Sequence, residues 1–146
     1  MERKIFSSKI LYLLNLIFNS GFLVLTLLSL LALVFIDDDN KLVQESKFEQ
    51  LALYSAYVIV YTIAIAVLFL KPKRAIFYLN LTYLVTLTIN FYEFLKYYSK
   101  SNHNSTKQIY VIMILIFIII FMSFIYFNNK YKFKMKFSEI EEIGTQ

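Results

Sequence analysis

The chain has 146 residues, 59% of them hydrophobic, and a water-soluble domain of this size would find that apolar surface hard to bury. Its net charge of +5 is spread along the chain beside the apolar segments, so the sequence predicts no nucleic-acid partner. Cysteine is absent, which excludes disulfides, thiol nucleophiles and thiolate metal sites.

Most of the chain lies in four long apolar runs, which cover residues 10–36, 51–70, 76–98 and 109–127. An α-helix needs roughly 20 apolar residues to cross roughly 30 Å of hydrocarbon. The sequence therefore predicts an all-α, polytopic membrane protein. Residues 1–128 would form an antiparallel bundle of four transmembrane helices, and residues 129–146 a tail that is first basic and then acidic. The first run is about twice as long as a signal-peptide core, so we expect it to be retained as a span.

The distribution of basic residues predicts the topology, because Lys and Arg concentrate on the cytoplasmic side. With four spans, both termini and the middle loop share one side. That side holds 10 of the 15 Lys and Arg residues, and the other side holds five, together with Asp37, Asp38 and Asp39. We expect a multi-pass protein of the cell membrane, in a bacterium the inner membrane, with both termini cytoplasmic. Pro72 cannot continue a helix, which predicts a tight hairpin between the second and third spans.

Polar residues inside the spans form stripes at helical spacing. The first run carries Tyr12, Asn15, Asn19, Thr26 and Ser29 on one face, and the third carries Tyr83, Thr86, Asn90, Glu93 and Tyr97. Two interpretations compete: the stripes pack helices together through hydrogen bonds, or they line a hydrated path or a partner-binding face. Packing is the more common role. Asn15 and Asn19 are the best candidates for a contact between helices or subunits, since two buried amides need several partners.

Glu93 is the only carboxylate inside a predicted span. It lies about five residues, or roughly 8 Å, from the external end of its run. Lys96 and Tyr97 follow at the i+3 and i+4 positions, so we expect ion pairing at the membrane interface rather than a central proton carrier. The fourth run is nearly free of polar groups, and we expect it to be the most lipid-exposed helix.

Charged and apolar residues alternate strictly in the segment after the fourth run. In an extended strand one face would carry the four lysines Lys130, Lys132, Lys134 and Lys136. This segment could lie on the membrane with its lysines on anionic lipid headgroups, add as a strand to a partner or neighbouring subunit, or serve as a positive stop. We favour the first interpretation, because the segment directly follows a span. The acidic residues beyond it could also bind a basic cytosolic protein.

No catalytic residues, metal ligands or cofactor motif stand out, so the sequence predicts no enzyme and no cofactor. Two functional classes fit. The first is a homo-oligomeric channel or membrane-perturbing effector of the lysis or defence type, with spans one and three lining the pore. The second is an accessory, sensor or toxin-immunity subunit that binds a partner protein. The first is favoured, because two polar stripes need burial and four helices are too few to enclose an aqueous path.

Overall fold

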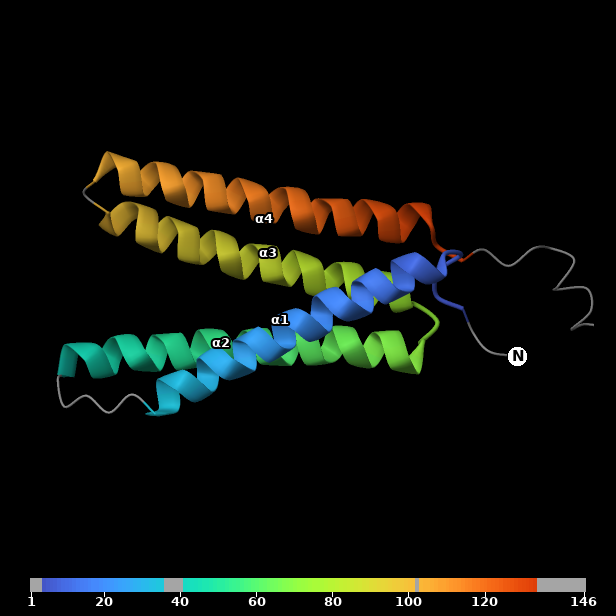
Figure 1. Ribbon diagram of the computed structural model, residues 1–146, viewed down its shortest axis with the longest axis horizontal. Helices are drawn as coiled ribbons and strands as arrows, with labels where there is room; N and C mark the ends of the chain where they lie inside the picture. Colours follow the sequence, from blue (N-terminus) through green and yellow to red (C-terminus); the bar gives the residue numbers. More distant parts are fainter. Residues whose placement is uncertain (1–3, 36–40, 102, 134–146) are drawn as a thin grey trace, which may run out of the picture.

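The computed structural model describes residues 4–35, 41–101 and 103–133. For residues 41–46 it describes the backbone only. These residues form four helices, α1 (Lys9–Phe35), α2 (Lys41–Leu70), α3 (Ala75–Lys100) and α4 (Asn104–Lys130) (Figure 1). All four contain a stretch long and apolar enough to cross a membrane, which in α2 is Lys47–Leu70. The four predicted spans are thus confirmed as helices, and α4 extends three residues beyond its predicted end.

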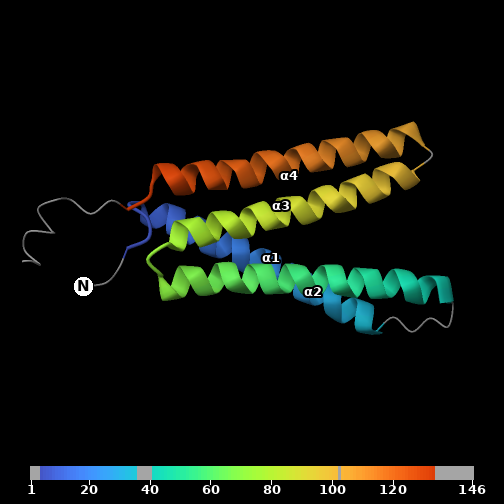
Figure 2. The same ribbon diagram turned by 180° about the vertical axis from the view of Figure 1, so that it is seen from behind.

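Helices that are adjacent in the chain pack on one another, whereas α1 meets α4 over a short stretch only. Figures 1 and 2 show α1 crossing α2 diagonally and α3 lying beside α4. The α1–α2 pair and the α3–α4 pair converge at one end of the molecule and diverge at the other. We call the first the closed end, which carries the α2–α3 turn, and the second the open end, which carries the α3–α4 turn.

The α2–α3 turn at the closed end has the tight form predicted around Pro72. Lys71 adopts a left-handed backbone conformation with φ of 47°, and its N–H bonds the carbonyl of Val67 at 3.1 Å, which ends α2. The carbonyl of Pro72 accepts a hydrogen bond from the N–H of Ala75, the first residue of α3, at 3.0 Å. Proline lacks a backbone N–H and so cannot continue α2, which explains why the reversal occurs here.

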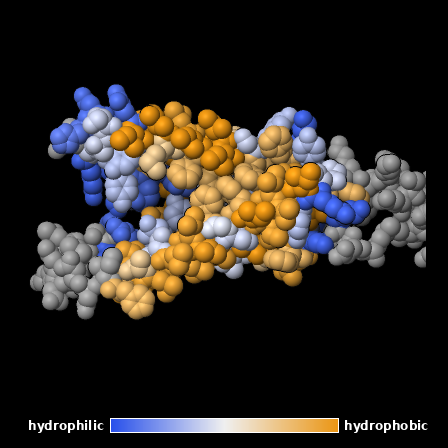
Figure 3. All heavy atoms as spheres, viewed as in Figure 1, coloured by the Kyte–Doolittle hydropathy of each residue, from blue (hydrophilic) through white to orange (hydrophobic). Residues whose placement is uncertain are grey.

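Much of the core lies toward the closed end, where the helices are close together. Among its fully buried residues are Leu68, Leu79, Tyr83 and Phe121. The ring of Phe18 on α1 contacts those of Tyr83 on α3 and Phe121 on α4 at centroid distances of 6.2 and 5.6 Å. Figure 3 shows apolar side chains over the middle of one face and hydrophilic side chains toward both ends, as a membrane-spanning protein requires. Four of the 27 residues of α1 are buried and three of the 27 of α4, so the two helices are similarly exposed, and the prediction that α4 is the most lipid-exposed helix stays a prediction.

The segments that flank α1 and α4 at the closed end pair with each other. Phe6 and Lys132 form an isolated antiparallel β-bridge. It is flanked by two backbone hydrogen bonds, from Ser7 N–H to the Tyr131 carbonyl at 2.9 Å and from Phe133 N–H to the Ile5 carbonyl at 3.1 Å. The side chains of Ile5 and Phe6 are buried against the core, which fixes this segment. The residues that follow α4 are therefore extended at Lys132, but they pair within their own chain.

Candidate functional site

A chain of side-chain hydrogen bonds joins α1, α3 and α4 in the buried part of the molecule. The Asn19 amide donates to the hydroxyl of Tyr83 at 2.8 Å, and that hydroxyl donates to Oδ1 of Asn15 at 2.7 Å. The Asn15 amide in turn donates to Oδ1 of Asn128 at 3.1 Å. All four side chains are fully buried. Because lipid and apolar core offer no competing partners, these bonds specify which faces of the three helices meet.

The same chain of bonds continues from Asn128 toward the surface of the closed end. The Asn128 amide donates to Oδ1 of Asn80 at 3.2 Å, and the Asn80 amide donates to Oδ1 of Asn129 at 3.1 Å. The Asn129 amide finally bonds the carbonyl of Ile125 at 2.9 Å. We call the six side chains Asn15, Asn19, Asn80, Tyr83, Asn128 and Asn129 the amide network. Every bond in it runs in the same direction, so each polarises the next.

The backbone of α1 holds the two deep amides in place. The Asn15 amide also donates to the carbonyl of Leu11 at 2.8 Å, and the Asn19 amide to the carbonyl of Asn15 at 2.7 Å. Both amide protons of each residue are therefore used, one inside the helix and one across to a neighbour. Among the described residues, Oδ1 of Asn19 is the one buried side-chain oxygen or nitrogen without a hydrogen-bond partner.

Four further residues of the predicted stripes donate hydrogen bonds to the backbone of their own helices. The hydroxyl groups of Thr26, Ser29 and Thr86 and the amide of Asn90 donate to backbone carbonyls within one turn. Tyr12 differs, because its hydroxyl donates to the carbonyl of Leu68 on α2 at 3.4 Å. Helical spacing predicts one shared face for each stripe. Within the residues that the structure describes, however, only Tyr12, Asn15 and Asn19 of the α1 stripe make side-chain hydrogen bonds to another helix.

Three members of the amide network are not predicted by the sequence pattern, namely Asn80, Asn128 and Asn129. The last two lie just beyond the predicted end of the fourth run, where polar residues read as the start of the tail. Their signal was present in the spacing: Ile114, Phe117, Phe121, Phe124 and Asn128 follow one another at intervals of 3, 4, 3 and 4 residues. That pattern extends the buried face of α4 by another turn.

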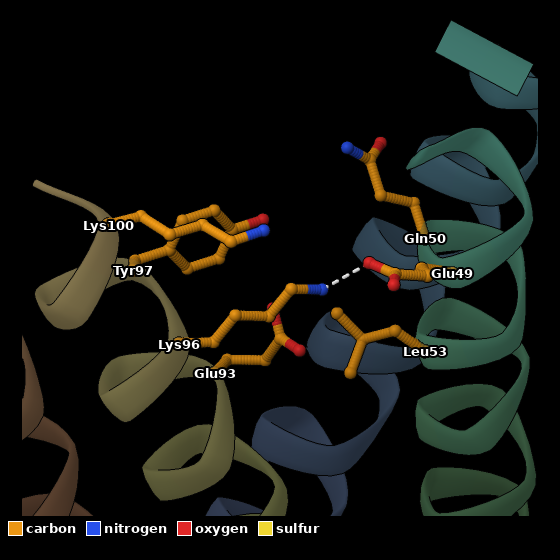
Figure 4. Close-up of a pocket in the computed structure, with 7 residues that line it drawn as sticks. All are labelled: Glu49, Gln50, Leu53, Glu93, Lys96, Tyr97 and Lys100. Atoms are coloured by element: carbon orange, nitrogen blue, oxygen red, sulfur yellow. Dashed lines mark hydrogen bonds and ion pairs between the residues drawn. The ribbon is translucent and has the colours of Figure 1, made fainter. Parts of the chain in front are cut away.

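A second polar region lies at the open end, in the cleft between α2 and α3. Its cavity of about 150 Å³ is lined by Glu49, Gln50 and Leu53 of α2 and by Glu93, Lys96, Tyr97 and Lys100 of α3 (Figure 4). Lys96 forms an ion pair with Glu49 across this cleft, and the pair joins the two helices where they diverge. We call this region the outer cleft.

Glu93 lies on the floor of the outer cleft, deeper than Lys96 in Figure 4. The sequence predicted that Lys96 and Tyr97 would pair with it, whereas the hydrogen-bonded partner of Lys96 is Glu49 of α2. Lys96 and Tyr97 nevertheless line the same cavity as Glu93. Among the side chains of residues 4–35, 47–101 and 103–133, none donates a hydrogen bond to its carboxylate. The outer cleft thus contains a carboxylate that lies near other charged groups and whose oxygens can still accept hydrogen bonds.

Lysines and tyrosines meet at both ends of the helices. Lys130 lies 5.6 Å from the ring centroids of Tyr126 and Tyr131, and Lys107 lies 5.3 Å from that of Tyr98. Such pairs suit the membrane interface, where the ring is partly in hydrocarbon and the ammonium is in the headgroup layer. Lys130 and Lys132 are exposed, and the proposed binding of lipid headgroups by them stays a prediction. Lys134 and Lys136 lie outside the described residues.

The described part of the chain contains no group of three or more His, Asp or Glu side chains placed to hold a metal ion. His103, the one histidine of the sequence, is exposed and precedes α4. Comparison of the chain with known protein families, with curated proteins and with solved structures finds no match. The two polar regions described above are therefore the basis for a functional proposal.

Proposed function

We propose that this chain is a non-enzymatic membrane subunit of the accessory, sensor or toxin-immunity type, which acts by binding a partner protein. The observation that supports this proposal is the amide network. Its deep members, Asn15, Asn19, Tyr83 and Asn128, are buried inside a single chain, and their hydrogen bonds are made to one another. A second copy is therefore not needed to bury the polar stripes, which was the main sequence argument for an oligomeric pore.

The closed end is the part of the molecule best suited to present a fixed surface to a partner. The aromatic core, the amide network and the bridge between Phe6 and Lys132 all hold this end together. Lys130 and Lys132 are exposed there. A cytoplasmic partner with an acidic surface would meet these lysines without any rearrangement of the four helices.

The second candidate is the homo-oligomeric channel or membrane-perturbing effector of the lysis or defence type. The observation in its favour is the outer cleft, which brings charged side chains into the space between two spans. In this proposal the clefts of several copies would form a vestibule. The apolar outer faces of α1 and α4, exposed at Leu28 and Ile119, would then contact neighbouring copies instead of lipid.

Both proposals place the closed end in the cytoplasm, because it carries the larger share of basic residues. The chain contains no cysteine, so a single introduced cysteine is the one thiol that can be labelled. Its labelling shows on which side of the membrane that position lies. We expect Cys introduced at His103 to react with a membrane-impermeant maleimide in intact cells. Cys introduced at Lys73 should react only after the membrane is permeabilised. The reverse pattern of labelling would invert the topology.

Mass and ion-flux measurements on the purified protein distinguish the two functions. For an accessory subunit we expect the protein in detergent to have the mass of one chain, and reconstituted liposomes to leak no faster than protein-free liposomes. A mass of several chains would favour the channel, as would a flux that rises more steeply than linearly with protein density. In that case Glu93→Gln should alter the flux, whereas Lys107→Gln, at the same end but not among the residues lining the outer cleft, should not.

A further inference from the structure

The outer cleft has the composition of a site for a small zwitterion. Its lining includes two carboxylates, Glu49 and Glu93, and two ammonium groups, Lys96 and Lys100, so its formal charge is zero. We propose that the outer cleft binds one phosphoethanolamine group, the headgroup of a zwitterionic phospholipid of the outer leaflet. This site is independent of whether the protein acts as an accessory subunit or as a channel.

The depth of the cleft matches the headgroup layer. Glu93 lies 18 residues beyond Ala75, the first residue of α3, which is about 27 Å along the helix axis. A hydrocarbon core of roughly 30 Å that begins near Ala75 therefore ends close to Glu93. Lys96 and Lys100 then project into the interface above it. A ligand at this level can keep its acyl chains in the bilayer while its polar group enters between α2 and α3.

The anionic half of the ligand has a defined place. Lys96 and Lys100 are one helical turn apart on α3 and both line the cavity, so a phosphate can contact the two ammonium groups together (Figure 4). Lys96 carries three N–H donors, so it can keep its bond to Glu49 and still donate to a phosphate oxygen. The Gln50 amide and the Tyr97 hydroxyl at the same rim supply further donors.

The cationic half is directed to Glu93. Its carboxylate accepts no hydrogen bond from the side chains that the structure describes, although Lys96 and Tyr97 line the same cavity. A primary ammonium brings three N–H donors to this acceptor, whereas the trimethylammonium of a choline brings none. The cavity of about 150 Å³ is smaller than the roughly 300–1,000 Å³ of sites for drug-sized molecules, which fits one headgroup with its chains outside.

Native mass spectrometry of the purified full-length protein tests this proposal. The delipidated protein is mixed with dioleoyl phosphatidylethanolamine, or with the phosphatidylcholine that differs by three N-methyl groups. We expect one tightly held phosphatidylethanolamine and an affinity about tenfold higher than for phosphatidylcholine, as the loss of a charge-assisted hydrogen bond implies. Glu93→Gln should remove this preference, and Lys100→Gln should weaken the binding of both lipids. Lys107→Gln, at the same end but not among the lining residues, should behave as the unmodified protein.

Two results would overturn the site. One is equal retention of the two lipids by the unmodified protein, and the other is an unchanged preference in Glu93→Gln together with unchanged binding of both lipids in Lys100→Gln. Lys100 is exposed, so its variant is informative even if Glu93→Gln unfolds. A further arm adds glycerophosphoethanolamine, which has the same polar group without acyl chains. Competition by this soluble ester at concentrations equal to those of the lipid would overturn the assignment to a phospholipid.

Discussion

Replacement of Asn15 by leucine is expected to lower the free energy of unfolding by about 1–3 kcal/mol. Asn15 is the centre of the amide network, since its side chain accepts from Tyr83 on α3 and donates to Asn128 on α4. Leucine has a similar size but no polar atoms, so the O–H of Tyr83 and the Oδ1 of Asn128 would each lose their partner in a buried place, while Tyr83 still accepts from Asn19 and Asn128 still donates to Asn80. Each interhelical bond in a membrane contributes about 0.6 kcal/mol on average, and two are lost together with the cost of the unpaired groups.

The matched control for this variant is Asn90→Leu. Asn90 is half-buried on α3, and its amide bonds only the carbonyl of Thr86 one turn earlier, at 2.8 Å. That replacement removes an amide without leaving a partner on another helix unpaired, and we expect it to change stability by less than about 0.5 kcal/mol. Reversible unfolding of both variants in bicelles measures the difference. Equal effects would contradict a packing role for the network.

Some features of this protein follow from the linear pattern of its residues alone. Hydrophobic length alone predicted four spans, because a helix in lipid must satisfy its backbone bonds internally wherever it lies. The spacing of Asn15 and Asn19 predicted a shared face, because residues four positions apart lie one above the other on a helix. The burial of Asn128 was not predicted, because a polar residue at the end of an apolar run gives the same sequence pattern whether it is buried or solvated. Only the packing of α1 against the last turn of α4 distinguishes these two cases.

The partners of charged groups were the least predictable part. Lys96 was expected to pair with Glu93 three residues earlier, but it bonds Glu49, which is 47 residues away in the sequence. Local spacing identifies residues that can meet on one helix. It does not predict which residue of α2 lies opposite a given residue of α3. The same limit applies to the segment around Lys132. Its alternation indicated an extended strand but not that Ile5, Phe6 and Ser7 would pair with it.

Phe121→Ala is expected to have the largest effect of the variants considered, a loss of about 3 kcal/mol in the free energy of unfolding. The Phe121 ring is fully buried and contacts the rings of Phe18, Tyr83 and Phe117 at centroid distances of 5.6, 5.7 and 6.4 Å. Because α1 meets α4 over a short stretch only, the ring of Phe124, which also contacts Phe18 and Tyr83, can replace only part of this packing. The same bicelle unfolding measurement gives the magnitude.

The control is Phe77→Ala, at a side chain that is 60% exposed on the outer surface of α3. Lipid chains can fill the space left at Phe77 but cannot enter the space left at Phe121, so we expect a loss below about 1 kcal/mol. The two core variants should also be coupled, because Asn15 and Phe121 both contact Tyr83. A double-mutant cycle of Asn15→Leu and Phe121→Ala should give an interaction energy of at least about 0.5 kcal/mol, whereas Asn15→Leu and Phe77→Ala should be additive. Additivity in both cycles would mean that the amide network and the aromatic core stabilise the helices independently.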